Sequence, residues 1–408
     1  MEGMIIIMEK IIKVIFVIIL VAIISLTCYS VVEKKTDINL STVQEEVIDK
    51  NSIQYTGWLK TQGSQLQNEK GEPIQLRGLS SHGIQWFYDI ITYENLQTLK
   101  KEWNTNVFRI AMYTDPNSNG YISNSTEIKE KVYNIIEMAI DLDMYVIVDW
   151  HILADNNPQI YETQSKEFFN EISNKYNNTP NVIYEICNEP NGYNVTWSNN
   201  VKPYAENIIQ TIRANSPKSL IIVGTPDWCK DLKNPADDPL NYENIVYACH
   251  FYAGSHNESL QSQIDYCLNK NLPVFISECG MTDATGSGII YEDNFKIWIN
   301  YINERNLSWL YWSLSNKDEE SSILTPDYHT AVNSDTSNSN NNNIETQINT
   351  TTNFVDSNSS YLENNTQLQN NNNINNSATS NTINTENSNI NEYLTKSGLI
   401  IKNILLKY

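Results

Sequence analysis

The sequence predicts a (β/α)8 barrel, which is a closed ring of parallel strands surrounded by helices. Short apolar runs rich in β-branched residues recur between residues 74 and 312, as expected for strands buried on both faces. Helical patterns with one apolar face separate these runs, which is typical of parallel strands joined by helices. Polar and aromatic residues follow many of the runs, and active sites of such barrels form at the C-terminal ends of their strands.

The elements follow in order from Tyr55. A short hairpin with its turn at Lys70-Gly71 comes first, followed by a strand at 74–79. The seven further strand candidates are 106–112, 144–149, 182–187, 219–223, 244–249, 273–277 and 308–312. A helix is predicted behind a Ser125/Thr126 cap, with Ile128, Val132, Ile135, Ala139 and Leu142 on one face. Phe295, Trp298, Ile299 and Ile302 form a similar face before the last strand.

The N-terminal segment predicts export. In residues 1–30, Glu9, Lys10 and Lys13 precede the run VIFVIILVAIISLTC, which resembles a secretory signal peptide. The segment is also nearly long enough to remain as a membrane anchor. Cleavage and anchoring both stay open, so we expect a secreted, extracellular or cell-surface protein. Residues 31–53 are polar and charged, which is typical of a linker.

The C-terminal part changes character abruptly. Residues 333–390 are almost wholly Asn, Ser, Thr, Gln and Glu, which predicts disorder because such a tract cannot bury enough apolar surface. Helical spacing of apolar residues then resumes in 391–408. Without them the barrel would end at Trp312 with no eighth helix, so we expect these residues to close the catalytic barrel of 54–332 as its last helix, burying Leu399, Ile401, Ile404 and Leu405, with the tract as an insertion. A tail that only happens to end in a helix-like segment is the alternative.

The composition argues against several classes of partner and site. The formal net charge of −21 argues against a nucleic-acid partner, whose phosphates would be repelled. The six cysteines show no CxxC spacing and predict neither a disulfide framework nor a zinc site. We therefore expect no metal ion and no cofactor, and we expect a monomer.

Two strand candidates end in glutamates. VIYEICNEPNG (182–192) carries Asn188 and Glu189 before Pro190, which cannot donate to a strand ladder, and PVFISECG (273–280) carries Glu278. Two carboxyl groups at one barrel edge are the pair that cleavage of a glycosidic bond needs. Other polar or aromatic residues at strand ends are His82, Trp86, Arg109, Asp149, Trp150, His151, Trp228, His250, Tyr252 and Trp312. Any one of them is more often structural, but together they favour an active site.

Seven motifs in order, LRGLSSHGIQWF, FRIAMY, VIVDWHIL, IYEICNEPNG, ACHFYAG, FISECG and YWSLSNKDEESS, resemble glycoside hydrolase family 5 endoglucanases of the bacterial cellulase branch. The resemblance covers about 54–328, and LTKSG near the C-terminus also resembles the start of that family's final helix. Cys279 departs from the family, which commonly has an aromatic residue after the nucleophile.

The resemblance implies a retaining endo-β-1,4-glucanase acting on a β-glucan polysaccharide, with Glu189 as acid/base and Glu278 as nucleophile. It further implies that Arg109 and Tyr252 hold the nucleophile. The implied substrate-binding residues are His82, Trp86, His151, Asn188, Trp228, His250, Trp312, Lys317 and Glu319.

The chemistry requires Glu278 to be ionised, which Arg109 favours, and Glu189 to start protonated, which nearby negative charge and partial burial favour. Three alternatives remain. The first is a hydrolase of another β-glycan, such as mannan, xylan or mixed-linkage glucan. The second is a non-catalytic carbohydrate-binding barrel. The third is a metal-dependent barrel hydrolase using His82, Asp149, His151 and His250, although no HxH or HExxH motif occurs.

Overall fold

The computed structural model describes residues 3, 7–8, 13–26, 49–50, 52–329 and 389–408. The chain divides into two units, Met1–Tyr55 and Thr56–Tyr408. In the first unit, residues 13–26 form a helix with exposed apolar side chains. No helix in the described stretches combines the length and apolar character needed to cross a membrane. Most of the predicted linker at 31–53 and nearly all of the predicted insertion at 333–390 lie outside the described residues.

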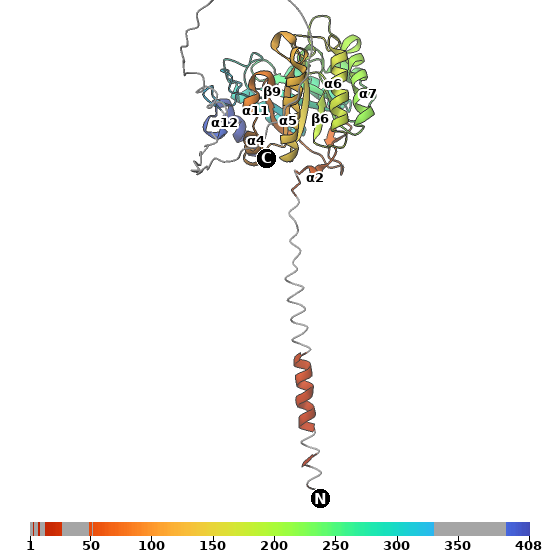
Figure 1. The fold of residues 1–408 in the computed structure, drawn as a ribbon, viewed down its shortest axis with the longest axis vertical. Coiled ribbons are helices and arrows are strands. Elements are labelled where there is room, and N and C mark those ends of the chain that lie inside the picture. The colour runs from red at the N-terminus through yellow and green to blue at the C-terminus, as the bar shows by residue number, and fades with distance from the viewer. Residues whose placement is uncertain (1–2, 4–6, 9–12, 27–48, 51, 330–388) are drawn as a thin grey trace, which may run out of the picture. The chain divides into compact units, whose positions relative to one another are not determined.

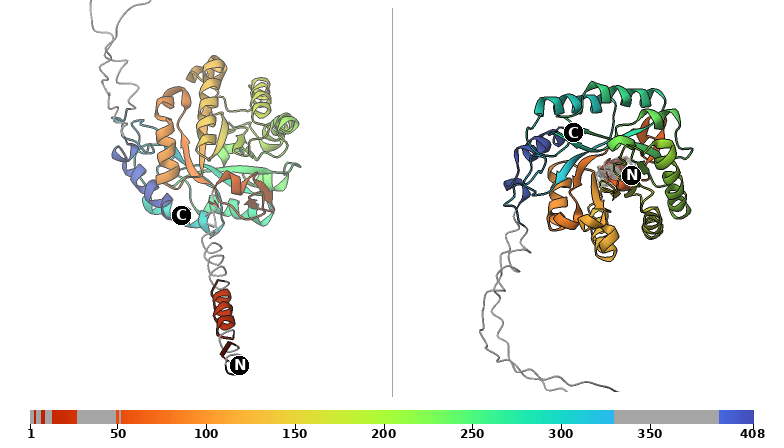
Figure 2. Two further views of the ribbon diagram at one scale, coloured as in Figure 1. Left: turned by 60° about the horizontal axis from the view of Figure 1, so that its bottom comes forward. Right: turned by 90° about the horizontal axis from the view of Figure 1, so that it is seen from above.

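Eight parallel strands close into a barrel within Thr56–Tyr408, so the predicted fold class is confirmed (Figure 2). The strands are β3 (Arg77–Ser81), β4 (Val107–Tyr113), β5 (Tyr145–His151), β6 (Val182–Glu185), β7 (Ile221–Val223), β8 (Ile245–Tyr252), β9 (Val274–Gly280) and β10 (Trp309–Leu314). They follow one another around the ring, and β10 pairs with both β9 and β3 to close it. Nearly all strand residues are buried because helices cover the outer face and side chains fill the interior.

Helices follow the strands and surround the barrel (Figure 1). They are α3 (Ile84–Phe87), α4 (Tyr93–Glu102), α5 (Tyr121–Asp141), α6 (Glu162–Lys175), α7 (Lys202–Asn215), α8 (Pro226–Cys229), α9 (Lys233–Asp237), α10 (Glu258–Asn269), α11 (Glu292–Glu304) and α12 (Lys396–Leu405). The two predicted apolar faces are buried in α5 with its C-cap and in α11. Helix α5 begins before the predicted cap, at Tyr121, and is interrupted by non-helical backbone at Asn124. Only its second part begins at the predicted place.

The predicted hairpin is present, but its turn was placed wrongly. Strands β1 (Lys60–Gln62) and β2 (Gln65–Gln67) pair antiparallel around Gly63, whose φ is +58°. Lys70-Gly71 forms a second turn, after which Pro73 bridges back to Gln67. Gly71 also has a positive φ, of +87°. Since each turn contains a glycine suited to such backbone, the sequence did not distinguish the hairpin turn from the one after it.

Residues 389–408 contact the segment that follows β10. The amide of Thr395 donates to the carbonyl of Ile323 at 3.0 Å, and Leu324 forms an antiparallel bridge with Leu394. A Cβ on Gly398 would lie 2.3 Å from the Ile323 carbonyl oxygen, so this approach requires glycine.

Helix α12 directs one face toward the core. Ile401, Ile404 and Leu405 are buried and belong to the same apolar cluster as the barrel helices. Leu399, which we expected to be buried with them, is 51% exposed. It lies two residues before Ile401, about 200° away around the helix, and therefore faces the other side.

Candidate active site

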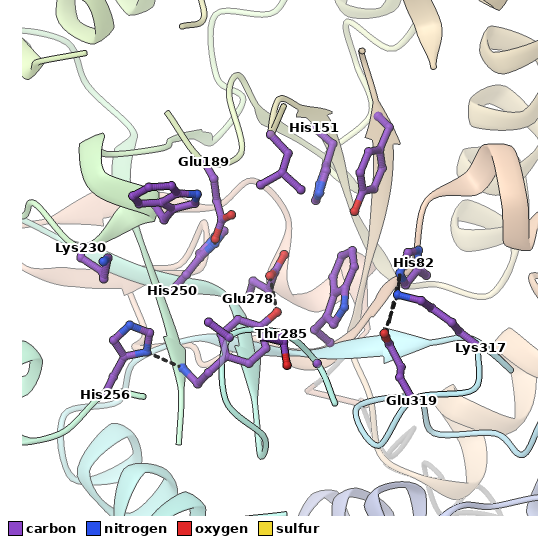
Figure 3. Close-up of a pocket in the computed structure, with 17 residues that line it drawn as sticks. His82, His151, Glu189, Lys230, His250, His256, Glu278, Thr285, Lys317 and Glu319 are labelled. Carbon is purple, nitrogen blue, oxygen red and sulfur yellow. Dashed lines mark hydrogen bonds and ion pairs between the residues drawn. The ribbon is translucent and has the colours of Figure 1, made fainter. Parts of the chain in front are cut away.

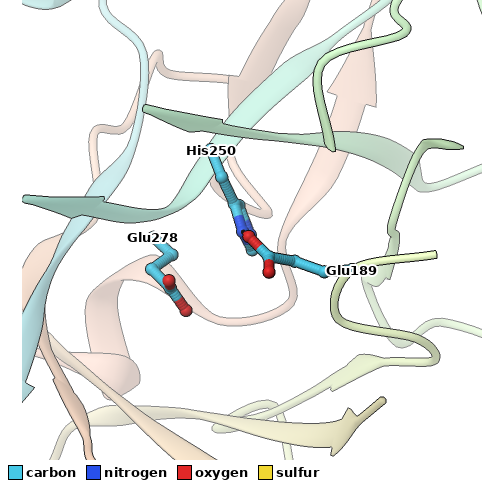
Figure 4. A group of neighbouring side chains, drawn as sticks. All are labelled: Glu189, His250 and Glu278. Atoms are coloured by element: carbon cyan, nitrogen blue, oxygen red, sulfur yellow. Dashed lines mark hydrogen bonds and ion pairs between the residues drawn. The ribbon is translucent and has the colours of Figure 1, made fainter. Parts of the chain in front are cut away.

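The two predicted catalytic glutamates lie together at the C-terminal edge of the barrel. Strand β6 ends at Glu185, earlier than predicted, and the irregular chain beyond it carries Asn188 and Glu189. Strand β9 carries Glu278 within its last three residues. Ligating atoms of Glu189, His250 and Glu278 all lie within 4.8 Å of one another (Figure 4).

Both carboxylate oxygens of Glu278 accept hydrogen bonds. Tyr252, at the end of β8, donates its hydroxyl to Oε1 at 2.7 Å, and Arg109 Nη1 donates to Oε2 at 3.1 Å. Arg109 is fully buried on β4. Burial alone would lower its pKa, but the carboxylates of Asp149, Glu185 and Glu278 raise the pKa well above the ordinary arginine value. A permanent cation and a hydroxyl donor therefore stabilise negative charge on Glu278.

Glu189 is hydrogen-bonded to a histidine, and the protonation state of Glu189 differs from our expectation. Its Oε1 lies 2.8 Å from Nδ1 of His250. Burial would raise the pKa of Glu189, but the hydrogen bond and charge of His250 outweigh it and lower the pKa. Burial would lower the pKa of His250, but Cys229, Glu278 and Glu185 raise it well above the ordinary value. In the free protein the proton of this pair therefore lies on the His250 side.

Asn188 and His151 connect to the same arginine. Arg109 Nη2 donates to Asn188 Oδ1 at 2.6 Å and contacts Asp149 Oδ2 at 3.0 Å. Asp149 Oδ2 also lies 2.6 Å from His151 Nδ1. Burial, and after it the Arg109 charge, lower the pKa of His151 to about 3, so His151 is neutral at neutral pH. A neutral imidazole with one nitrogen held by a carboxylate keeps a fixed orientation.

A cavity of about 460 Å³ opens over the glutamates (Figure 3). Ten of the predicted site residues line it: His82, His151, Glu189, Trp228, His250, Tyr252, Glu278, Trp312, Lys317 and Glu319. Arg109 and Asn188 are buried behind its wall. Trp86 does not line the cavity, but its ring centre is 5.1 Å from that of Tyr113, which does, and it is 47% exposed.

The tryptophans differ in what they present to the cavity. Trp228 is 43% exposed and therefore leaves more of its side chain accessible in the cavity wall than Trp312 does. Trp312 is largely buried and stacks on His151, with ring centres 5.5 Å apart and 19° between planes. Only the remaining surface of Trp312 faces the cavity.

Lys317 and Glu319 form an ion pair at one end of the cavity (Figure 3). Their Nζ and Oε2 atoms are 2.5 Å apart, and Lys317 Nζ also lies 3.5 Å from His82 Nε2. Burial, followed by the Lys317 charge, lowers the pKa of His82 to about 3. This end of the cavity therefore offers donors and acceptors to uncharged hydroxyl groups.

Several site residues were not predicted. Tyr113, Leu153, Lys230, His256, Ala284, Thr285 and Gly286 also line the cavity. Ser277 is buried and contacts both His250, which lines the cavity, and the buried Glu185. Glu185 could have been found, because a carboxylate inside an apolar strand needs a buried partner. The residues from loops, such as Thr285 and Gly286, carry no sequence signal of this kind.

Most residues of the metal-dependent alternative bind other groups of the protein. Asp149 binds Arg109 and His151, while His82 accepts the Gly83 amide at 2.7 Å through Nδ1. In the described part of the chain, the group that could hold a metal ion is Glu189, His250 and Glu278. The absence of a metal and of a cofactor stays a prediction.

A barrel with two glutamates at the C-terminal edge of its strands has the architecture of a glycoside hydrolase. The model of the cellulase family, glycosyl hydrolase family 5, matches residues 67–318. The chain therefore belongs to this family.

Relatives and solved structures agree with this assignment. An endoglucanase of Clostridium saccharobutylicum is 49% identical over 270 residues, which are 66% of this chain and 60% of that protein. Endoglucanase A of Evansella cellulosilytica is 50% identical over 256 residues, 63% of this chain and 52% of that protein. The chain thus spans about half to three fifths of the length of these relatives.

Among solved structures, the catalytic domain of Thermobifida fusca endoglucanase Cel5A is 36% identical, with a TM-score of 0.64 and coverage of 67% of this chain and 90% of that one. A glutamate-to-glutamine variant of that domain was solved in complex with cellotetraose, at 35% identity and a TM-score of 0.64.

Proposed function

We propose that this chain is an endo-β-1,4-glucanase that hydrolyses internal bonds of cellulose or a related β-glucan with retention of configuration. The observation that carries the proposal is the pair of glutamates whose nearest ligating atoms are within 4.8 Å. Retaining glycosidases hold their two carboxyl groups about 5–5.5 Å apart, whereas inverting enzymes need about 6.5–9.5 Å to accommodate a water molecule. The short separation supports a double displacement.

The different surroundings of the two glutamates support their roles. Glu278, fixed by Arg109 and Tyr252, attacks the anomeric carbon as the carboxylate, and the bond to the leaving oxygen breaks while Glu189 supplies a proton to that oxygen. Water then attacks the glycosyl-enzyme, gives a proton to Glu189, and releases Glu278 as a carboxylate. His250 is hydrogen-bonded to Glu189 and shares this proton with it in both steps.

The cavity wall supports a glucan substrate. Indole faces pack against the C–H faces of pyranose rings, and Trp228 presents such a face beside the catalytic pair. Lys317 and Glu319 offer hydrogen bonds to hydroxyls at the other end. The names of the relatives, and the cellotetraose bound to the Thermobifida fusca variant, favour a β-1,4-glucan over the alternatives.

Replacement of Glu278 by alanine tests the mechanism. Glu278→Ala should abolish release of reducing sugar, and added azide should restore turnover of an activated aryl cellobioside by taking the place of the lost carboxylate. The product of that rescue should be the glycosyl azide of inverted configuration. Near-normal activity of Glu278→Ala would show that Glu278 is not the nucleophile.

Export and the N-terminal segment are part of the proposal. A polymeric substrate outside the cell requires the barrel to be exported, and the apolar run VIFVIILVAIISLTC resembles a signal peptide and is nearly long enough for an anchor. N-terminal sequencing of the exported protein distinguishes the two, because cleavage removes residues 1–30 and anchoring keeps them. A protein retained inside the cell would contradict both.

A further inference from the structure

Strands β8 and β9 pair irregularly beside the catalytic glutamates. Ala248 pairs with Phe275 and His250 pairs with Glu278, so one more residue separates the pairs on β9 than on β8. Successive side chains of a regular strand point to opposite faces, and a bulge re-aims a side chain. Ser277 and Glu278, although adjacent, both make their contacts inside the barrel.

Four side chains form a continuous hydrogen-bonded chain through this bulge. Glu185 Oε1 accepts the Ser277 hydroxyl at 2.7 Å. Ser277 Oγ lies 3.0 Å from His250 Nε2, and His250 Nδ1 lies 2.8 Å from Glu189 Oε1. All four residues are buried. The chain therefore links a buried carboxylate on β6 to the acid/base.

The positions of the hydrogen atoms in this hydrogen-bonded chain of side chains follow from its Glu185 end. Glu185 Oε2 accepts Arg109 Nε at 2.6 Å, and the Arg109 charge, outweighing burial, lowers the pKa of Glu185 to about 2. A carboxylate can only accept hydrogen bonds, so the single hydroxyl hydrogen of Ser277 points to Glu185. Ser277 then offers only a lone pair to His250, and the hydrogen between them must be on Nε2.

We propose that Ser277 and Glu185 are positioning residues for acid/base catalysis: they keep a hydrogen on Nε2 of His250 and thereby place the catalytic proton in the bond between Nδ1 and Glu189. The proposal rests on the acid/base role of Glu189 proposed above. In the first displacement the shared proton passes to the leaving oxygen through the Glu189 carboxyl, as the C–O bond breaks and its electron pair forms the O–H bond. His250 is left neutral with its hydrogen on Nε2.

The second displacement restores the starting state. The oxygen of the attacking water bonds to the anomeric carbon, Glu278 departs as a carboxylate, and one water proton returns to the bond between Glu189 and His250. Glu185 remains ionised throughout, and its negative charge, transmitted by the Ser277 hydroxyl, stabilises the protonated imidazole.

Other groups facing His250 do not replace this contact. Glu278 and Glu189 lie on its catalytic side, Cys229 approaches from α8, and the Asp149 charge acts from β5. Electrostatic interactions also reach His250 from Cys249, Cys279 and His256. The structure gives Nε2 a hydrogen-bond partner in Ser277, whereas Glu185 itself is 3.9 Å away. Removing the Ser277 hydroxyl therefore leaves Nε2 without its acceptor.

Variants of Ser277 test the proposal through the pH profile of kcat/KM on a cello-oligosaccharide. In Ser277→Ala the shared proton should be lost more easily, so the alkaline limb should move to lower pH by about one unit while the acidic limb stays in place. Ser277→Thr keeps a hydroxyl and should keep the wild-type alkaline limb. With a dinitrophenyl cellobioside, whose leaving group needs no proton, Ser277→Ala should show no such shift.

A merely structural role gives a different result. If Ser277→Ala lowers the rate equally at every pH, or if Ser277→Thr shifts the profile as alanine does, Ser277 only fills space and the proposal fails. Wild-type protein that releases no sugar from any β-glucan would instead contradict the proposed function.

A second measurement needs neither a variant of Ser277 nor activity. In ¹⁵N-histidine-labelled wild-type protein, which has five histidines, the resonances of His250 can be assigned by their loss in His250→Asn. We expect Nε2 to stay protonated on both sides of the alkaline titration while Nδ1 loses its proton. A neutral form with its hydrogen on Nδ1 would overturn the proposal.

Discussion

A pair of alanine substitutions in α12 tests whether this helix is part of the barrel. Ile401 is fully buried, whereas Leu399 in the same helix is 51% exposed. Truncating a buried isoleucine costs about 2–5 kcal/mol of unfolding free energy, and an exposed substitution changes it by about 0.5 kcal/mol at most. For a domain of this size, Ile401→Ala should lower Tm by roughly 4–20 °C. Leu399→Ala is the matched control and should change Tm by no more than about 2 °C.

Thermal unfolding of the full chain, followed by circular dichroism, measures both variants. Alanine has the higher helix propensity in each case, so local helix stability cannot explain a selective loss in Ile401→Ala. Equal Tm values for the two variants would refute the packing of α12 on the barrel. Two deletions extend the test. Removing 392–408 should destabilise the protein. Replacing 333–388 by a short linker should not, since closing so long a loop costs only about 1–2 kcal/mol more than closing a short one.

Two further predictions concern the chemistry. Glu189→Ala should lose activity on cello-oligosaccharides but still form the glycosyl-enzyme from an aryl cellobioside with a good leaving group. Mass spectrometry of the accumulated intermediate checks this. Equal loss of activity on both substrates would contradict the acid/base role. Initial rates on soluble cellulose, mixed-linkage glucan, xylan and mannan should be highest on a β-1,4-glucan, and fastest release from mannan would overturn the substrate proposal.

The barrel could be predicted because its signal is local. Apolar runs such as 144–149 and 273–277 correspond to β5 and β9, and the predicted boundaries differ by only a few residues. The hairpin turn could not be placed, since Gly63 and Gly71 are both suited to positive φ and the choice depends on which segments pair. The burial of Leu399 was wrongly predicted because the contact face of α12 is set by the segment around Ile323.

The proximity of Glu189 and Glu278 could also be predicted, since both follow predicted strands that meet at one edge of the barrel. Their proton chemistry could not. We expected nearby negative charge and burial to keep Glu189 protonated, but the contact with His250 lowers its pKa. That contact joins residues 61 positions apart, and no pattern in the sequence indicates which imidazole nitrogen faces the carboxylate.

The sequence by itself determined the ring of strands and the placing of the two glutamates at one barrel edge, because periodicity and residue type at strand ends are local properties. The contacts of Arg109 and Tyr252 with Glu278 were implied by the resemblance to family 5 endoglucanases. Only the tertiary structure decided how charge is distributed among them. Arg109 contacts Asp149, Glu185 and Glu278 at once, and a bulge in β9 directs Ser277 toward His250. Electrostatic interactions inside a barrel depend on distances across its interior, and those distances exist only once the eighth strand has closed against the first.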